Sequence, residues 1–219
     1  MNSAASQWQV VVLTGGGSRR MGRDKATLDV AGASLLDRTL AGVPADVNVV
    51  VAGPPVSVAR DGVRFVQEVP PGGGPVAGLD AALTAVTAPV VVVLATDLPL
   101  IGTLPAALAD ALLRDTGRDP PVDGVLATDA SGHPQQLCAA YRSAALRDAI
   151  AAGGTAQGVA MHSVLARLRT SAISGHVCVE LGTSDAPDPT WDIDTPDDVQ
   201  RLTQLLDETS TDSPGGCDG

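Results

Sequence analysis

A glycine-rich segment early in the chain combines backbone donors with positive side chains, which suits it to binding a phosphate group. Glycines 15–17 directly follow an apolar run, and backbone N–H groups in such a turn can approach a phosphate closely. The positive side chains of the segment are Arg19, Arg20, Arg23 and Lys25. A tight surface turn with solvated charges is the alternative, but Lys25 is the only lysine of the chain. We therefore predict a local site for a triphosphate.

Two common phosphate motifs do not fit this segment. A P-loop requires lysine directly after its second glycine, whereas here Gly22 is followed by Arg23. A dinucleotide fingerprint that starts at Gly15 requires glycine at the position of Arg20. The segment therefore predicts a glycine loop of another kind.

A second glycine-rich loop begins at Glu68 and reads EVPPGGGPVAG. Its glycines permit a ligand to approach the backbone, and its prolines stiffen the loop. The Glu68 carboxylate, at the end of a predicted strand, suits a base with adjacent N–H donors, such as the N1–H and N2 amine of guanine. The alternative is a structural loop in which Glu68 is solvated.

Two acidic segments are candidates for a metal site. Asp97 ends an apolar run, and ligands of α/β proteins bind where strands end. One or two carboxylates with substrate phosphates suit Mg²⁺, whereas a turn or helix cap is the alternative role for Asp97. Asp192 and Asp194 are two residues apart in a segment predicted to be extended, so their side chains share a face. One of them would complete the metal site with Asp97. The alternative is that both serve a helix start.

The elements that must position these residues alternate between strand and helix. Continuous apolar runs at 9–13, 47–52, 63–67 and 90–95 predict strands that are covered on both faces. Helical patterns cover 35–42, 76–87, 104–114, 144–152 and 159–168. A strand pair at 125–128 and 136–141 and a late strand at 176–181 follow, and Thr195-Pro196 predicts the start of a helix that runs to about Asp207. The order predicts an α/β fold: a three-layer, doubly wound, mostly parallel sheet.

The composition excludes several classes of function. The net charge of −11 opposes bulk binding of nucleic acid, and two Trp, one Tyr and one Phe provide too few faces for stacking bases. The longest apolar run, at 89–95, is far shorter than the roughly 20 residues of a membrane span. Three well-separated cysteines fit a reducing compartment. We expect a cytoplasmic protein with a single domain over 1–207 and a disordered tail over 208–219.

Taken together, these segments resemble the molybdenum cofactor guanylyltransferase family, within the MobA-like nucleotidyltransferases. The family pattern LAGGxSxRMGxDK corresponds to LTGGGSRRMGRDK, which ends at Lys25, and DxxPGxGPLAGL corresponds to EVPPGGGPVAGL, which begins at Glu68. The family's acidic elements correspond to TDLPLI around Asp97 and DIDTPDDV from Asp192, and its HPxxLxALY stretch corresponds to HPQQLCAAY from His133. The resemblance covers about 11–206 and implies a Rossmann-like fold of the nucleotide-diphospho-sugar transferase type.

The resemblance implies transfer of GMP from GTP to the phosphate of molybdopterin, with Mg²⁺ as the cofactor and release of pyrophosphate. Asp97 would bind the metal, with Asp194 as a second ligand, and Arg20, Lys25 and Asp97 would be catalytic. The pterin would lie near the His133 loop and Asp192. The implied nucleotide-binding residues are Leu13, Thr14, Gly15, Gly16, Arg20, Lys25, Glu68 and Asp97.

The resemblance also implies which partners to expect. These are GTP, molybdopterin and transient contact with other molybdenum cofactor enzymes. We expect a monomer, and the charge and the short apolar runs predict that it binds neither nucleic acid nor membrane. Glu68 stands where the family usually carries Asp, and Asp192 and Asp194 replace a frequent Asn pair. A cytidylyltransferase acting on molybdopterin or another phosphorylated metabolite is therefore one alternative, and a non-catalytic nucleotide-binding module is another. Gly16, in the Gly-Gly pair of the first glycine-rich segment, favours guanine, because CTP-using relatives tend to carry Ala-Ala-Gly there.

Overall fold

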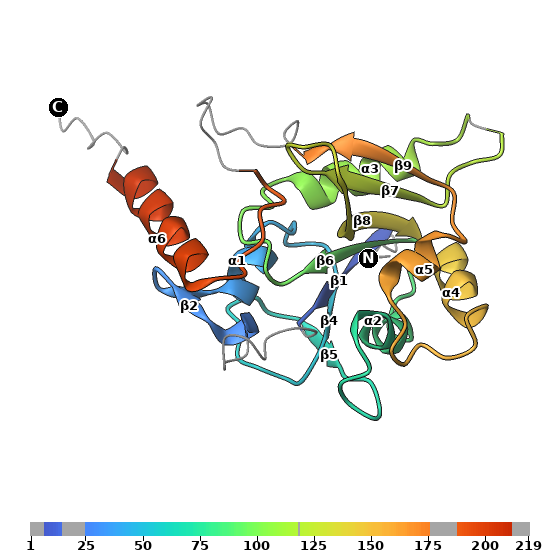
Figure 1. Ribbon diagram of the computed structural model, residues 1–219, viewed down its shortest axis with the longest axis horizontal. Coiled ribbons are helices and arrows are strands. Elements are labelled where there is room, and N and C mark those ends of the chain that lie inside the picture. Colours follow the sequence, from blue (N-terminus) through green and yellow to red (C-terminus); the bar gives the residue numbers. More distant parts are fainter. Residues whose placement is uncertain (1–6, 15–24, 118, 176–187, 212–219) are drawn as a thin grey trace, which may run out of the picture.

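The computed structural model describes residues 7–14, 25–117, 119–175 and 188–211 (Figure 1). The strands of its main sheet are β1 (Trp8–Leu13), β4 (Val49–Ala52), β5 (Arg64–Val66), β6 (Val90–Ala95), β7 (Gly124–Thr128), β8 (Pro134–Arg142) and β9 (Thr170–Ser174). They lie in the order β5-β4-β1-β6-β8-β7-β9. Only β8 runs antiparallel to its neighbours among these described strands. The predicted mostly parallel sheet is confirmed.

Helices cover both faces of this sheet. The helices α1 (Leu35–Ala41) and α3 (Leu104–Leu113) pack on one face, and α2 (Pro75–Leu83), α4 (Ser143–Ala151) and α5 (Met161–Leu165) pack on the other (Figure 1). Alternate residues of β1 point to opposite faces, so Val10 lies in one apolar cluster and Val11 in the other. This arrangement explains why the strand is a continuous apolar run, and it confirms the predicted three layers.

Some elements differ from the prediction. The short 3-10 helix η2 (Lys25–Thr27), the hairpin of β2 (Asp29–Val30) and β3 (Ala33–Ser34), and the edge strand β9 were not predicted. The predicted strand at 176–181 lies outside the described residues. The last helix, α6 (Pro196–Thr211), continues past Asp207, so the expected start of the tail at residue 208 lies within the helix. Within the described ranges, no helix combines the length and the apolar character needed to cross a bilayer.

A third, smaller apolar cluster lies apart from the two faces of the sheet. It is formed by Val30, Leu35, Ile193 and Leu202, with Leu28, Leu100, Trp191, Val199 and Leu206 packed against it. The cluster joins the β2–β3 hairpin, the start of α1 and α6, which lie together at one end of the molecule (Figure 1). It therefore fixes the chain on the C-terminal side of Lys25 relative to the chain around Ile193.

Candidate active site at the ends of β1 and β6

The carboxyl ends of β1 and β6 meet at one edge of the sheet. The two strands are parallel neighbours, and Leu13 pairs with Ala95 at their last residues. Thr14 directly follows β1, and Asp97 is the second residue after β6. Residues after adjacent parallel strands emerge at the same edge, so the topology places Thr14 and Asp97 at one edge of the sheet.

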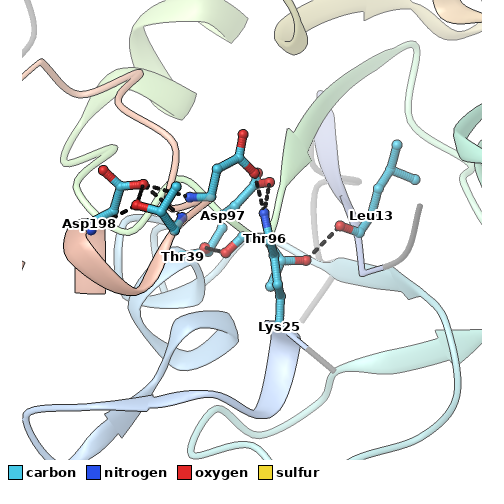
Figure 2. Close-up of polar contacts among 8 residues, drawn as sticks. Leu13, Lys25, Thr39, Thr96, Asp97 and Asp198 are labelled. Atoms are coloured by element: carbon cyan, nitrogen blue, oxygen red, sulfur yellow. Dashed lines mark hydrogen bonds and ion pairs between the residues drawn. The ribbon is translucent and has the colours of Figure 1, made fainter. Parts of the chain in front are cut away.

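Lys25, Asp97 and Asp194 converge at this edge. The Lys25 Nζ lies 2.5 Å from Oδ1 of Asp194 and 3.4 Å from Oδ2 of Asp97. The lysine side chain is 16% exposed, that of Asp97 is 27% exposed and that of Asp194 is 64% exposed. Figure 2 shows Lys25 reaching from its 3-10 helix toward Asp97. Three residues that the sequence analysis singled out separately therefore form one cluster.

The charges of this cluster shift the pKa values of its members. Partial burial acts to lower the pKa of Lys25, but the hydrogen bond with Asp194 and the charge of Asp97 outweigh it and raise the pKa above 10.5. The hydrogen bond from Lys25 lowers the pKa of Asp194 below 3.8. Loss of solvent around Asp192 and the negative charge of Asp194 raise the pKa of Asp192. At neutral pH the ammonium and the Asp194 carboxylate are therefore both charged.

The pH dependence of stability follows from these two shifts. The contribution of Asp194 is present above 3.8 and is lost as the pH falls through its lowered folded-state pKa, whereas that of Lys25 is present below 10.5 and is lost at higher pH. Asp194→Asn is expected to lower the free energy of unfolding by less than about 1 kcal/mol at pH 7, because the Asp194 side chain is 64% exposed. Urea unfolding of the variant and the unsubstituted chain at pH 7 and near pH 2.5 measures the difference in their free energies of unfolding. A difference that is as large at the lower pH as at pH 7 would show that the stabilisation does not come from the ionised Asp194.

Asp194 is placed by the buried residue that precedes it. Ile193 is fully buried, and its N–H donates to the Asp97 carbonyl oxygen at 3.0 Å. Asp192 and Asp194 on either side are exposed, which confirms that they share a face. Thr195 precedes α6, and its Oγ1 accepts a 3.2 Å hydrogen bond from the Asp198 N–H, as expected of the predicted N-cap.

Two threonines that the sequence analysis missed hold Asp97 in position. Thr96 is buried, and its hydroxyl and N–H both donate to the Leu13 carbonyl oxygen, at 2.5 Å and 3.2 Å (Figure 2). The Thr39 hydroxyl of α1 lies within donor distance of the Thr96 carbonyl oxygen, at 3.1 Å. These bonds tie the residue before Asp97 to both β1 and α1. A buried polar residue at the end of an apolar strand was the available sequence signal.

Thr96→Val is expected to lower the free energy of unfolding by about 1 kcal/mol, because the variant loses a buried hydrogen bond but keeps nearly the same shape. The Leu13 oxygen retains the Thr96 N–H as a donor, which limits the loss. Urea unfolding measures the effect. Thr128→Val is a matched control, because its hydroxyl makes a longer bond of 3.4 Å to Ile173 on β9. Equal losses in the two variants would contradict the role of Thr96.

Thr14 and Glu68 line the neighbouring part of the edge. The Thr14 N–H and hydroxyl donate to the Ala52 carbonyl oxygen, and a Cβ at Gly53 would lie 1.9 Å from the Thr14 Oγ1. Oε1 of Glu68 accepts hydrogen bonds from the N–H groups of Gly72 and Gly73, at 2.9 Å and 3.3 Å. Glu68 therefore binds the backbone of its own loop, a contact that the sequence analysis did not predict.

Several predicted site residues fall outside the described part of the chain. These are Gly15, Gly16 and Arg20, with the neighbouring Arg19 and Arg23.

The His133 loop is described and joins β7 to β8. In this loop Asp129 accepts hydrogen bonds from the N–H groups of Ser131 and His133. The His133 imidazole is 79% exposed, with Nδ1 at 3.7 Å from Oδ1 of Asp129.

The carboxylates at the sheet edge fit a metal that takes most of its ligands from elsewhere. Asp97 and Asp194 converge on one cation, the Lys25 ammonium. No cluster of three or more His, Cys, Asp or Glu residues suited to a metal occurs in the described ranges. Mg²⁺ commonly binds one or two carboxylates together with substrate phosphates and water. The donor set is therefore compatible with Mg²⁺ that arrives with a nucleotide.

The sequence relatives point to one group of proteins. The chain is 31% identical over 208 residues to a molybdenum cofactor guanylyltransferase of Rhodobacter capsulatus, covering 90% of the chain and 95% of that protein. It is also 39% identical over 94 residues, or 42% of its length, to a probable molybdenum cofactor guanylyltransferase of Pelotomaculum thermopropionicum. The chain spans about half the length of this relative (45%) and of a probable molybdenum cofactor guanylyltransferase from Opitutus terrae (53%).

Solved structures share the fold. The chain resembles the molybdopterin-guanine dinucleotide biosynthesis protein A of Archaeoglobus fulgidus with a TM-score of 0.65 and 22% identity, over 91% of the chain and 99% of that structure. It resembles the 2-C-methyl-D-erythritol 4-phosphate cytidylyltransferase of Thermus thermophilus with a TM-score of 0.63 and 19% identity, over 91% and 98%. Residues 10–172 match the family described as MobA-like NTP transferase domain. The chain belongs to this family of nucleotidyltransferases.

Proposed function

We propose that the chain is a Mg²⁺-dependent guanylyltransferase that transfers GMP from GTP to the phosphate of molybdopterin and forms molybdopterin guanine dinucleotide. The observation that carries the proposal is the convergence of Lys25, Asp97 and Asp194 at the edge where β1 and β6 end. The name of the Rhodobacter capsulatus relative supports the choice of guanine nucleotide and cofactor.

The proposed reaction is a direct displacement at phosphorus. A phosphate oxygen of molybdopterin forms a bond to the α-phosphorus of GTP, while the bond from that phosphorus to the bridging oxygen breaks and pyrophosphate leaves with the electron pair. No covalent intermediate on the chain is required. The protonated Lys25 would stabilise negative charge on the phosphates, and Arg20 would contribute a second positive group.

Asp97 and Asp194 would hold Mg²⁺. When bound, Mg²⁺ supplies charge neutralisation at the reacting phosphates. The chain's own contribution is to hold the two carboxylates close together. Thr96 fixes the backbone before Asp97, and the buried Ile193 fixes the backbone before Asp194. We propose that Leu13, Thr14, Gly15, Gly16 and Glu68 bind the nucleoside.

A cytidylyltransferase of the same fold is the second candidate. Oε1 of Glu68 accepts the hydrogen bonds from the N–H groups of Gly72 and Gly73, and neither of these two bonds involves Oε2. Recognition of guanine through Glu68 would therefore use mainly Oε2, which lies 3.9 Å from the position of a Cβ at Gly78. Base choice thus requires a direct measurement.

Calorimetric titration with GTP and with CTP, each with Mg²⁺, separates the two candidates. We expect GTP to bind at least 10-fold more tightly than CTP, and pyrophosphate release to require molybdopterin as the acceptor. Tighter binding of CTP would support the cytidylyltransferase instead. Absence of turnover with every nucleotide and acceptor tested, in a chain that still binds nucleotide, would identify a non-catalytic module.

The remaining expectations concern the setting of the reaction. We propose a monomer with a single domain that acts in the cytoplasm and receives molybdopterin through transient contact with other molybdenum cofactor enzymes. The separated cysteines support a reducing compartment. Size-exclusion chromatography with light scattering tests the monomer.

A further inference from the structure

Asp198, the third residue of α6, accepts hydrogen bonds from Thr195 at the start of its helix and also from Asp194, which precedes the helix. Its Oδ2 accepts hydrogen bonds from the N–H and the hydroxyl of Thr195, both at 2.8 Å, and from the N–H of Asp194 at 3.1 Å. A capping box requires only the reciprocal bonds between the N-cap residue and the third helical residue. The bond to Asp194 lies outside that motif and needs another explanation.

The additional bond fixes the backbone of Asp194 on its second side. On the first side, the Ile193 N–H is bound to the Asp97 carbonyl oxygen at 3.0 Å, and the Ile193 side chain is fully buried. The Asp194 side chain is 64% exposed, so packing around it does little to set its direction. The backbone sets the direction in which the Asp194 side chain leaves the chain, and the Lys25 ammonium then holds Oδ1 of Asp194. The 3.1 Å bond to Asp198 restrains that backbone.

We propose that Asp198 is a positioning residue for the carboxylate of Asp194 in the Mg²⁺ site. This inference rests on the proposed function, because that function makes Asp194 a metal ligand. Asp198 would act through the backbone, without touching the metal. Hydrogen-bond partners behind metal ligands typically change metal affinity by about 10- to 100-fold when they are removed.

The charge of Asp198 does not account for such an effect on Asp194. Its negative charge opposes ionisation of the Asp194 carboxylate, whereas Lys25 lowers the pKa of that carboxylate. The geometric role and the charge are separable by substitution. Asp198→Asn keeps an acceptor oxygen of the same reach and removes the charge, whereas Asp198→Ala removes both.

Binding of Mn²⁺ in the presence of saturating GTP tests the proposal by calorimetry, without reference to turnover. We expect Asp198→Ala to weaken Mn²⁺ binding at least 10-fold and Asp198→Asn to stay within 3-fold of the unsubstituted chain. Asp197→Ala is the matched control, since Asp197 is an exposed acid in the same helical turn. We expect it to stay within 3-fold as well. In turnover assays, Asp198→Ala should raise the metal concentration for half-maximal rate more than it lowers kcat.

Three results would overturn the proposal: normal Mn²⁺ binding by Asp198→Ala, an equal loss in Asp198→Asn, or an equal loss in Asp197→Ala. Thermal melting shows whether each variant is folded at the assay temperature. If Asp198→Ala does not fold, Asp198→Glu decides, because glutamate retains a capping-box acceptor but moves it away from the Asp194 N–H. Weakened Mn²⁺ binding by Asp198→Glu would support the proposal, and unchanged binding would overturn it.

The unsubstituted chain separates the two levels of inference. If it binds no Mn²⁺ in the presence of GTP, the proposed function fails and the role of Asp198 fails with it. If it binds Mn²⁺ and the Asp198 variants bind equally well, only the positioning role is wrong.

Discussion

Lys25→Ala is expected to lower the rate of pyrophosphate release at saturating GTP at least 100-fold. Removal of one charged or hydrogen-bonding group that stabilises developing charge typically lowers kcat by about 10²- to 10³-fold. The substitution also leaves the carboxylates of Asp97 and Asp194 without the cation that they share, so they repel each other. The measurement is the initial rate of pyrophosphate release with molybdopterin as the acceptor.

The fold should tolerate this substitution. The contacts of Lys25 to the carboxylates are partly exposed, and such pairs contribute about 0–1 kcal/mol to the free energy of unfolding. Arg114→Ala is a matched control, because it removes an exposed ion pair with Asp110 on α3. We expect the control to keep its turnover. A Lys25→Ala rate within 3-fold of the unsubstituted chain would remove Lys25 from the reaction.

Asp97→Asn is expected to lower turnover by about 10³-fold or more and to weaken Mn²⁺ binding. The loss of a metal ligand removes several kcal/mol of charge stabilisation, and each 1.36 kcal/mol corresponds to a factor of about 10 in rate. The asparagine side chain has the same shape, so the backbone bonds of Thr96 and Ile193 should persist. Turnover as a function of Mg²⁺ concentration, together with calorimetry with Mn²⁺, measures both effects.

Asp110→Asn is the corresponding control, because Asp110 is an exposed carboxylate on α3 that pairs with Arg114. It should leave the Mg²⁺ response unchanged. A normal response to Mg²⁺ in Asp97→Asn would show that Asp97 is not a metal ligand.

The parts of the fold that follow from the sequence are those with strong local signals. The four Val-rich runs became β1, β4, β5 and β6, and the predicted bounds of the last, 90–95, match β6 (Val90–Ala95). Both faces of β1, β4 and β6 are covered by helices, and this coverage is what a continuous apolar run reports. The predicted coverage of the strand at 63–67 was wrong, because β5 lies at the edge of the sheet and its residues are exposed or only partly buried. Thr195-Pro196 likewise marked the start of α6, because capping chemistry depends on neighbouring residues.

The elements that were missed carry weaker local signals. The strands β2 and β3 have two residues each, too short for any periodic pattern. The edge strand β9 reads TSAIS and is only half buried, so it shows no apolar run. The 3-10 helix at Lys25 is a single turn. The strand β9 pairs with β7, and Val30 of β2 packs with Leu202 of α6, so both depend on segments distant in the sequence.

The candidate site likewise combines residues that local sequence signals identify with contacts that they do not predict. The residue types and their positions after strands identified Lys25, Asp97 and Asp194 as candidates, but their mutual contact joins residues far apart in the chain. That contact depends on the small apolar cluster around Ile193, which no single segment predicts. Thr96 was missed as a positioning residue because its partner Leu13 is distant in the sequence. Asp198 was missed although its partners are local, because its bond to the Asp194 N–H lies outside the capping box.

The location of a bound nucleotide would decide whether this edge of the sheet is the active site. In a crystal structure determined with GTP and Mg²⁺, we expect the metal against the carboxylates of Asp97 and Asp194, and the phosphates within hydrogen-bond reach of Lys25. A nucleotide bound elsewhere on the chain, with the Lys25 ammonium still paired to Asp194, would contradict the proposed site.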